Sequence, residues 1–457
     1  MRFCITTLGC KVNQYESQAM EYLLCEQGHE AAALGDGCDV CIINTCAVTA
    51  ESERKSRQAV RRMKKLEPDA FIAVCGCYSQ LNPEAVSKLG VDLVGGISDR
   101  AWDRGTVLLS PSNRKTGHKN DSVMPNIYNQ SPPVLFEELP PGNTASRTRA
   151  LLKIQDGCNN FCAYCIVPYI RGRSRSLPLE RAREYAAQLE EQGYKEIVVT
   201  GIEIASYGKD LMKQRTCLPA SEITEQRTCP PASDLIKAIK TIGEAAQNVR
   251  IRLGSLSPSI MTEEFCKELS KIPNLCNHFH LSLQSGCDET LKRMGRKYTV
   301  NQVLKSIKSI RKYFNNDGED CGITADLIVG FPGETDEEFN KTLGFIKKAG
   351  FSDMHIFPYS IRPGTKAAQL PGQIDKSVKK ERAKKAAVIA NEIAENFRKN
   401  QLSKTMEVLF EQESNGLFTG HSRNYLQVTV KENVKKNCIK KVKITGAKNS
   451  ILTGEIV

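Results

Sequence analysis

The sequence has no run of 18 or more apolar residues, which argues against a membrane-spanning helix. Its first residues, Met1–Thr7, are strand-like and lack the charged and then apolar segments of a secretory leader. A cytoplasmic protein is therefore expected. The 18 cysteines do not indicate a disulfide framework, because the cytosol keeps thiols reduced. They favour metal ligation by a few thiols among a background of buried ones.

Length and charge limit the organisation of the chain. A protein of 457 residues is too long for one ordinary core and indicates about three domains. The formal net charge is +12, and residues 376–457 contain 17 Lys and Arg against 8 Asp and Glu. A basic terminal segment is typical of a phosphate-binding surface, although a solvated helix face explains the cations of 376–399 equally well.

The hydrophobic pattern predicts an α/β protein in three parts. Apolar runs that alternate with amphipathic stretches predict a parallel α/β domain over residues 1–110, followed by a Pro- and Asn-rich linker, 111–145. Six further runs over 146–399 predict an open (β/α)6 partial barrel that ends in a basic helix, and 400–457 predict a small all-β domain. The predicted strands are 3–8, 40–44, 71–74 and 91–94, then 150–154, 196–200, 249–253, 278–283, 323–329 and 354–357.

The most informative motif is Cys158-Asn-Asn-Phe-Cys162-Ala-Tyr-Cys165, here named the loop trio, which follows the first predicted barrel strand. Three thiolates hold three corners of a four-iron cluster and leave one iron open, whereas electron-transfer clusters normally have four. S-adenosylmethionine can chelate the open iron, so the spacing predicts radical chemistry on this cofactor. The alternatives are unrelated buried thiols or a zinc knuckle, but residues 166–205 contain neither Cys nor His to complete one.

Three cysteines of the first domain are placed alike. Cys10, Cys46 and Cys77, here named the sheet trio, each lie in the turn after an apolar run. In a parallel sheet such turns meet at one edge, which predicts a second three-thiolate site, with buried core thiols as the alternative. The pair Cys38-x-x-Cys41 resembles half of a zinc site, but Cys41 lies within a predicted strand and no partner pair follows it.

This order of domains and cysteines resembles the methylthiotransferase family of radical-SAM enzymes over nearly the whole chain. The segment 8–16, Leu-Gly-Cys-Lys-Val-Asn-Gln-Tyr-Glu, is similar to the branch that modifies N6-threonylcarbamoyladenosine in tRNA. The isopentenyladenosine branch typically has Gly-Cys-Gln-Met-Asn, and the branch acting on a ribosomal protein has Gly-Cys-x-Lys-Asn. Other matching segments are 171–175, 252–256, 280–286, 293–298, 326–334 and 357–365.

The resemblance implies two [4Fe-4S] clusters. The loop trio would hold the cluster that cleaves S-adenosylmethionine to a 5′-deoxyadenosyl radical, and the sheet trio would hold an auxiliary cluster that carries the inserted sulfur. A second S-adenosylmethionine would supply the methyl group, and the radical would take hydrogen from C2 of the modified adenosine at position 37, next to the anticodon. Residues 400–457 would form an RNA-binding TRAM domain. The expected partners are tRNA and an electron-donor protein, without DNA or membrane.

Further side chains are candidates for binding the cofactor and the RNA. Tyr164 suits an aromatic ring packed against adenine. Glu203 stands where the resemblance implies a histidine, and its carboxylate would accept from the amino group of the cofactor. The candidates at strand ends are Gly201, Glu203, Ser255, Gln284 and Arg296, with surface loops, caps or salt bridges as alternatives. Those for RNA are Arg171, Arg173 and Arg175, predicted to form a basic lip, and Asn13, predicted to lie between the clusters.

Two other functions stay open from the sequence: methylthiolation of a protein side chain, and a tRNA-binding iron–sulfur sensor without turnover. The basic tail disfavours the first, and the intact loop trio disfavours the second. A tandem duplication, Gln214–Ser221 and Gln226–Ser233, is predicted to be a surface insertion, with metal ligation by Cys217 and Cys229 as the alternative.

Overall fold

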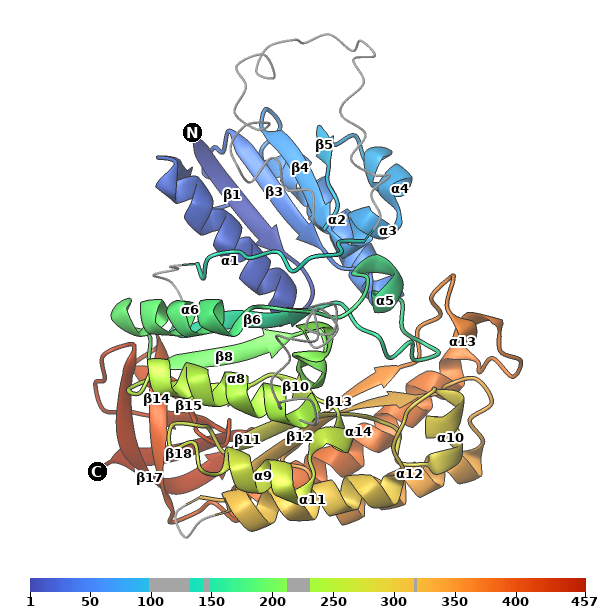
Figure 1. Cartoon of the computed structure of the whole chain (residues 1–457), viewed down its shortest axis with the longest axis vertical. Coiled ribbons are helices and arrows are strands. Elements are labelled where there is room, and N and C mark those ends of the chain that lie inside the picture. The colour runs from blue at the N-terminus through green and yellow to red at the C-terminus, as the bar shows by residue number, and fades with distance from the viewer. Residues whose placement is uncertain (98–131, 143–147, 212–230, 316–318) are drawn as a thin grey trace, which may run out of the picture.

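The computed structural model describes residues 1–97, 132–142, 148–211, 231–315 and 319–457 (Figure 1). The chain forms, in order, a parallel α/β domain, an open barrel of parallel strands and a closed five-stranded β barrel. In Figure 1 the first domain lies above the open barrel, and the closed barrel lies at the lower left. Among the described residues, no helix has both the length and the apolar character needed to cross a membrane.

The first domain is a parallel sheet with helices on both faces. Its strands are β1 (Arg2–Thr7), β2 (Glu30–Ala31), β3 (Val40–Thr45), β4 (Phe71–Gly76) and β5 (Leu93–Val94), in the order β2-β1-β3-β4-β5. Its helices are α1 (Lys11–Glu26), α2 (Ala50–Leu66), α3 (Cys77–Leu81) and α4 (Pro83–Ser87). In β3, Val40 and Ile42 pack with α1, whereas Cys41 and Ile43 pack with α2, because side chains alternate along a strand. The predicted strands are confirmed.

The central domain is an open barrel of six parallel β/α units, as predicted. Its strands are β6 (Arg149–Asp156), β8 (Glu196–Gly201), β9 (Arg250–Leu253), β10 (Ser255–Leu256), β11 (His278–Gln284), β12 (Gly322–Val329) and β13 (Asp353–Pro358), with a short antiparallel β7 (Arg175–Ser176) beside β6. The third unit is divided at Gly254, because β9 pairs with β8 while β10 pairs with β11. The apolar strand residues and the surrounding helices form one continuous core.

The helices of the barrel alternate with its strands. They are α5 (Val167–Ile170), α6 (Leu179–Glu191), α8 (Pro231–Ala245), α9 (Glu263–Leu269), α10 (Asp288–Arg293), α11 (Val300–Phe314), α12 (Asp336–Ala349), α13 (Lys366–Gln369) and α14 (Lys376–Lys399), with 3-10 turns η3 (Ile204–Ser206) and η5 (Pro258–Ile260). Thr299 and Thr335 begin α11 and α12 with capping boxes. The duplicated segment falls largely on 212–230, outside the described residues, and its last residues begin α8.

The C-terminal domain is a closed barrel in the order β14-β15-β16-β18-β17. Its strands are β14 (Thr405–Ser414), β15 (Leu417–Ser422), β16 (Gln427–Val430), β17 (Cys438–Lys448) and β18 (Ile451–Ile456). Val442 and Ile444 of β17 point into its core, whereas the alternating residues Lys441 and Lys443 are exposed. The all-β prediction is confirmed.

Buried arginines of β9 join this module to the open barrel. Arg252 donates to the backbone carbonyls of Ser422 at 3.1 Å and Arg423 at 2.8 Å, and both Arg250 and Arg252 form ion pairs of 2.7 Å with Glu196. Burial alone would raise the pKa of Glu196, but the two guanidinium groups outweigh burial and lower it to about 2. The two barrels are therefore joined by buried, charge-assisted contacts.

Candidate active site

The loop trio lies directly after β6, at the carboxyl ends of the barrel strands, where barrel enzymes place reactive groups. The loop is held by backbone hydrogen bonds at both ends, from Cys158 N to Gly172 O at 3.0 Å and from Ala163 N to Met294 O at 2.8 Å. Gly157 has φ +67°, and a Cβ there would lie 2.0 Å from Arg173 O. Only glycine therefore lets the loop pass this close to its neighbour.

The three thiols of the loop lie close enough to influence one another. Burial raises the pKa of Cys158 to about 11 and that of Cys165 to about 12, and the charges of neighbouring thiolates add to this effect. Thiols in such a site stay protonated unless a metal holds them as thiolates. The donor set, three cysteines on one loop with no fourth, fits a four-iron cluster with one open iron.

A buried carboxylate supports the cofactor side of this site. Glu203 is buried directly after β8, and Asn160 Nδ2 of the loop donates to its Oε2 at 3.4 Å. Its Oε1 has no hydrogen-bond partner among the described residues, and burial raises the pKa of Glu203. A buried acceptor without a donor is costly, so a cationic amino group at this position would satisfy it. The residues present therefore fit S-adenosylmethionine.

Arg296 reaches the same loop from the segment after α10. Its Nη1 donates to Cys162 Sγ at 3.3 Å, Nη2 donates to Ser282 O at 2.9 Å, and Nε donates to the Tyr298 hydroxyl at 2.9 Å. The guanidinium is therefore fixed beside a cluster ligand. Its positive charge would offset the negative charge of a thiolate-bound cluster.

The other predicted cofactor residues lie at the same strand ends. Gly201 ends β8, and a Cβ there would lie 2.8 Å from Gln155 O. Ser255 opens β10, and Gln284 ends β11 with φ +69°, where the register of the β11–β12 pair shifts. The ring of Tyr164 meets that of Phe331 edge to face at 6.5 Å. Their contact with a cofactor remains a prediction.

The sheet trio lies at one edge of the first domain. Cys10 is the N-cap of α1 after β1, Cys46 follows β3, and Cys77 begins α3 after β4. Burial, together with the charges of Cys46 and Cys10, raises the pKa of Cys77 to about 12. The first helix begins at Lys11, directly after Cys10, whose backbone is extended at the N-cap position.

Two features shape the loops that carry the sheet trio. The Asn13 side chain, predicted to lie between the clusters, donates to Leu8 O at 3.0 Å and to Thr45 O at 2.9 Å, which joins the Cys10 and Cys46 loops. Gly76 has φ +94°, and a Cβ there would lie 2.6 Å from Thr45 O. Three cysteines converging from three strand ends form a donor set like that of the loop trio.

A buried ion-pair network connects the two trios. Arg171 Nη1 donates to Glu16 Oε1 at 2.9 Å and to Asp156 Oδ1 at 3.1 Å, and Nη2 donates to Asn13 Oδ1 at 2.8 Å. Lys153 Nζ lies 3.4 Å from Glu16 and 3.3 Å from Asp156. Burial alone would raise the pKa of Asp156, but these cations hold it well below its usual range. The charge of Arg171 also opposes the rise in the pKa of Cys77, so it reaches the sheet trio.

The prediction that three arginines form a basic lip is wrong for two of them. Arg171 is 1% exposed and Arg175 is 4% exposed. Arg175 donates to the backbone carbonyls of Pro133 at 2.8 Å and Arg171 at 2.7 Å, so it braces the loop from inside. Only Arg173 is exposed, with its guanidinium 4.6 Å from the centre of the Phe161 ring. Sequence alone gives no partner for Arg171, because Glu16 lies 155 residues away.

Comparisons with known proteins agree with this site. Residues 152–346 match the Radical SAM superfamily, and residues 2–96 match Uncharacterized protein family UPF0004. A threonylcarbamoyladenosine tRNA methylthiotransferase of Bacillus subtilis (strain 168) is 37% identical over 93% of this chain and 89% of its own length. A tRNA-2-methylthio-N(6)-dimethylallyladenosine synthase of Alkaliphilus oremlandii (strain OhILAs) is 34% identical over 90% of this chain and 82% of its length.

A solved structure shares the fold at low identity. The radical S-adenosylmethionine methyltransferase TsrM of Kitasatospora setae has a TM-score of 0.52 at 14% identity, over 78% of this chain and 72% of its own. The barrel and loop trio thus define a radical-SAM enzyme, which binds a [4Fe-4S] cluster and S-adenosylmethionine. With the first domain and the relatives at 32–37% identity, the chain belongs to the methylthiotransferase family of radical-SAM enzymes.

Proposed function

We propose that this enzyme converts N6-threonylcarbamoyladenosine at position 37 of tRNA to its 2-methylthio derivative. A tRNA substrate is supported by the names of the relatives, which methylthiolate tRNA. The particular base is supported by segment 8–16 and by four relatives of 32–37% identity named for threonylcarbamoyladenosine. Relatives named for dimethylallyladenosine, at 32–34%, make that base the alternative. These tRNA-directed relatives favour tRNA over a protein side chain as the substrate.

The observation that carries the proposal is the buried Arg171 network, which joins two three-cysteine sets from different domains. The loop trio would hold the cluster that binds S-adenosylmethionine, and the sheet trio would hold a second [4Fe-4S] cluster. When bound, these groups supply hydrogen abstraction, a sulfur atom and a methyl group. Glu203 would bind the amino group of the cofactor, and Arg296 would stabilise the negative charge at Cys162. An electron-donor protein would deliver the reducing equivalents.

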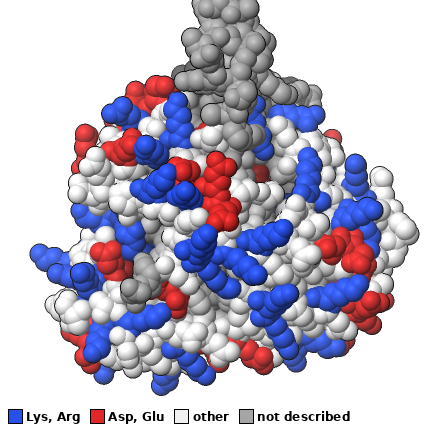
Figure 2. Space-filling view, turned by 60° about the horizontal axis from the view of Figure 1, so that its bottom comes forward, with Lys and Arg blue, Asp and Glu red and all other residues white. Residues whose placement is uncertain are grey.

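A basic crevice where the three domains meet would bind the RNA backbone. A cavity of about 650 Å³ is lined by Lys11 of α1, Arg149 of β6, and Tyr425 and Lys436 of the C-terminal barrel. Arg149 pairs with Glu411 at 2.6 Å, and Lys11 and Lys436 add two further positive charges that suit a phosphate group. Lys and Arg are also spread over the face in Figure 2, with Asp and Glu in smaller groups. The target base would enter from a single-stranded loop, as RNA-reading proteins require.

The test is mass spectrometry of tRNA nucleosides from a strain that lacks this protein. Loss of 2-methylthio-N6-threonylcarbamoyladenosine, with accumulation of the unthiolated nucleoside, is the expected result. The gene for the intact chain should restore the modification, whereas the matched Cys162→Ala variant should not. Loss of the isopentenyl derivative instead would assign the enzyme to the isopentenyladenosine branch. An unchanged nucleoside profile would reject a tRNA substrate.

A further inference from the structure

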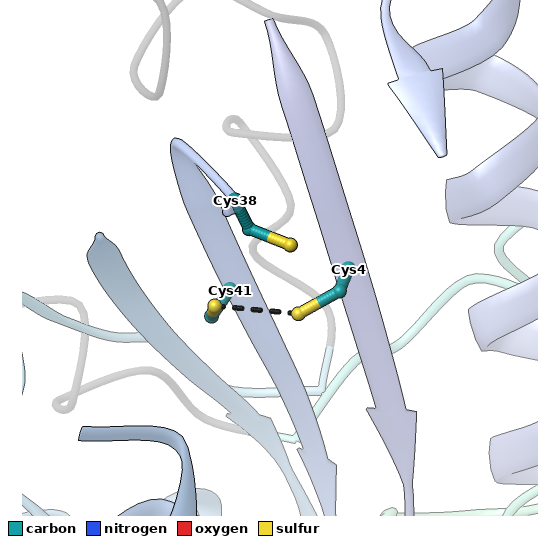
Figure 3. Close-up of side chains that lie close together, drawn as sticks. All are labelled: Cys4, Cys38 and Cys41. Carbon is teal, nitrogen blue, oxygen red and sulfur yellow. Dashed lines mark hydrogen bonds between the residues drawn. The ribbon is translucent and has the colours of Figure 1, made fainter. Parts of the chain in front are cut away.

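Cys4, Cys38 and Cys41 form a compact group of buried thiols in the first domain (Figure 3). Their Sγ atoms all lie within 4.8 Å of one another, and those of Cys4 and Cys41 are 3.3 Å apart. Cys4 and Cys41 are register partners in β1 and β3. Cys46 of the sheet trio follows Cys41 by five residues, which corresponds to about 16 Å along a strand. The group is therefore separate from the cluster sites.

The spacing of these thiols fits one metal ion. Thiolates bound to a tetrahedral ion at about 2.3 Å stand about 3.8 Å from one another. The separations in this group, 3.3 Å for one pair and at most 4.8 Å for the others, bracket that value. A four-iron cluster is larger than one ion and needs thiolates that stand farther apart. The three residues are only 0–7% exposed, so water does not complete the coordination.

Glu67 offers a carboxylate beside Cys38, outside the set of sulfur atoms that stand within 4.8 Å of one another. Glu67, directly after α2, accepts from Cys38 N through Oε2 at 3.0 Å and from Gly35 N through Oε1 at 2.8 Å. These bonds fix it beside the Cys38 thiol. Arg2 Nη1 donates to Gly37 O at 3.1 Å, which brings a positive charge to the same turn. That charge offsets part of the negative charge that three thiolates and a carboxylate leave around a divalent ion.

We propose that Cys4, Cys38, Cys41 and Glu67 bind one structural zinc ion. Three thiolates and one carboxylate make a closed tetrahedral set, and closed sets of soft ligands are typical of structural zinc. The ion fastens β1, β3, the turn before β3 and the end of α2. Because β1 and β3 lead to Cys10 and Cys46, the zinc holds the two strands that carry most of the sheet trio.

The experiment uses the full chain, anaerobically reconstituted to its full iron content and then passed over a chelating resin. We expect about one zinc per chain by elemental analysis. The zinc X-ray absorption edge, which iron does not obscure, should show three sulfur neighbours at about 2.3 Å and one oxygen. Cys4→Ser and Cys38→Ser should each lose the zinc and keep the iron. The control Cys266→Ser, a buried cysteine outside the group, should keep both.

Absence of zinc from the intact protein would overturn the proposal. So would zinc that persists in both serine variants, or an edge spectrum with only nitrogen and oxygen neighbours. Should the serine variants not fold, Glu67→Gln gives the second test, because it keeps an acceptor for the backbone but loses the anionic ligand. It should release zinc to a chelator at least tenfold faster than the intact protein, and an equal rate would remove Glu67 from the site.

Discussion

Arg171 of the barrel donates to Asn13 of the first domain at 2.8 Å, and this contact lies between the two cysteine trios. Asn13 in turn fixes the loops that carry Cys10 and Cys46. Arg171 therefore couples the position of the sheet trio to that of the open barrel. The exposed Arg173, two residues on, makes no such link.

Replacement of Arg171 by Met should destabilise the protein by about 3–5 kcal/mol, because it leaves the buried carboxylates of Glu16 and Asp156 without their main cation. Urea unfolding of the anaerobic protein measures this change. The sheet trio should also lose iron before the loop trio does. The matched control is Arg173→Met, which should change stability by less than about 0.5 kcal/mol. Equal effects of the two substitutions would contradict the network.

Iron content tests the two cluster sites separately. The reconstituted chain should bind about eight irons, in keeping with two four-iron clusters. A triple alanine variant of the loop trio should retain about half, and so should a triple alanine variant of the sheet trio. An unchanged iron content in the second variant would sink the auxiliary-cluster proposal. Cys25→Ala, an exposed cysteine outside both trios, is the control and should bind as much iron as the intact chain.

Much of this architecture follows from the sequence, because apolar runs of strand length and the turns after them are local properties. The six barrel strands and the positions of both trios at strand ends were predictable in this way. Burial of Arg171 was not, because charged residues are usually exposed and its partners come from other segments. The proximity of Cys4 to the Cys38-x-x-Cys41 pair was not predicted either. A zinc site is usually sought as a second pair later in the sequence, whereas Cys4 precedes this pair and lies on a neighbouring strand.

Glu203 should contribute to binding of S-adenosylmethionine through its buried, unpartnered oxygen. Glu203→Gln removes the negative charge and keeps the shape, so the dissociation constant should rise about tenfold or more, as expected when a hydrogen bond to a charged group is removed. Equilibrium dialysis of the reconstituted protein measures it. Glu203→His introduces the residue that the family resemblance implies. The exposed Glu264→Gln serves as control, and equal affinity in all variants would place the amino group elsewhere.

His278 should make stability depend on pH below neutrality. The ring is buried, bonded to Thr324 Oγ1 at 3.1 Å and stacked on Tyr425 with centroids 4.8 Å apart. Burial, with the charge of Arg252, lowers the pKa of His278 well below its usual value. Below about pH 6.5, His278 therefore binds a proton in the unfolded chain but not in the folded protein. Stability should fall with decreasing pH, with His278 adding about 1.4 kcal/mol per unit to the slope.

Urea unfolding of the anaerobic protein between pH 7.5 and 5 measures that slope. In His278→Asn the slope should decrease by about the contribution of one proton. The control His355→Asn replaces an exposed histidine and should leave the slope unchanged. Equal slopes for the intact protein and His278→Asn would show that the buried ring is protonated in the folded state.

The C-terminal barrel should bind RNA phosphates through the exposed lysines of β17. Truncation at residue 400 is a poor test, because it would uncover Arg252, whose guanidinium donates to Ser422 and Arg423 of that barrel. Lys441→Gln with Lys443→Gln changes charge on the outer face alone. For each phosphate that the variant no longer neutralises, the slope of log affinity against log salt should decrease by roughly 0.7–0.9.

A salt titration of tRNA binding measures this slope, beside an assay for 5′-deoxyadenosine, whose formation should be unaffected because both trios lie in other domains. The matched control is Lys384→Gln with Lys385→Gln on the exposed face of α14. If the control pair flattens the slope and the β17 pair does not, the RNA lies along the helix instead of the C-terminal barrel. If neither pair changes the slope, the crevice of Lys11, Arg149 and Lys436 becomes the principal phosphate site.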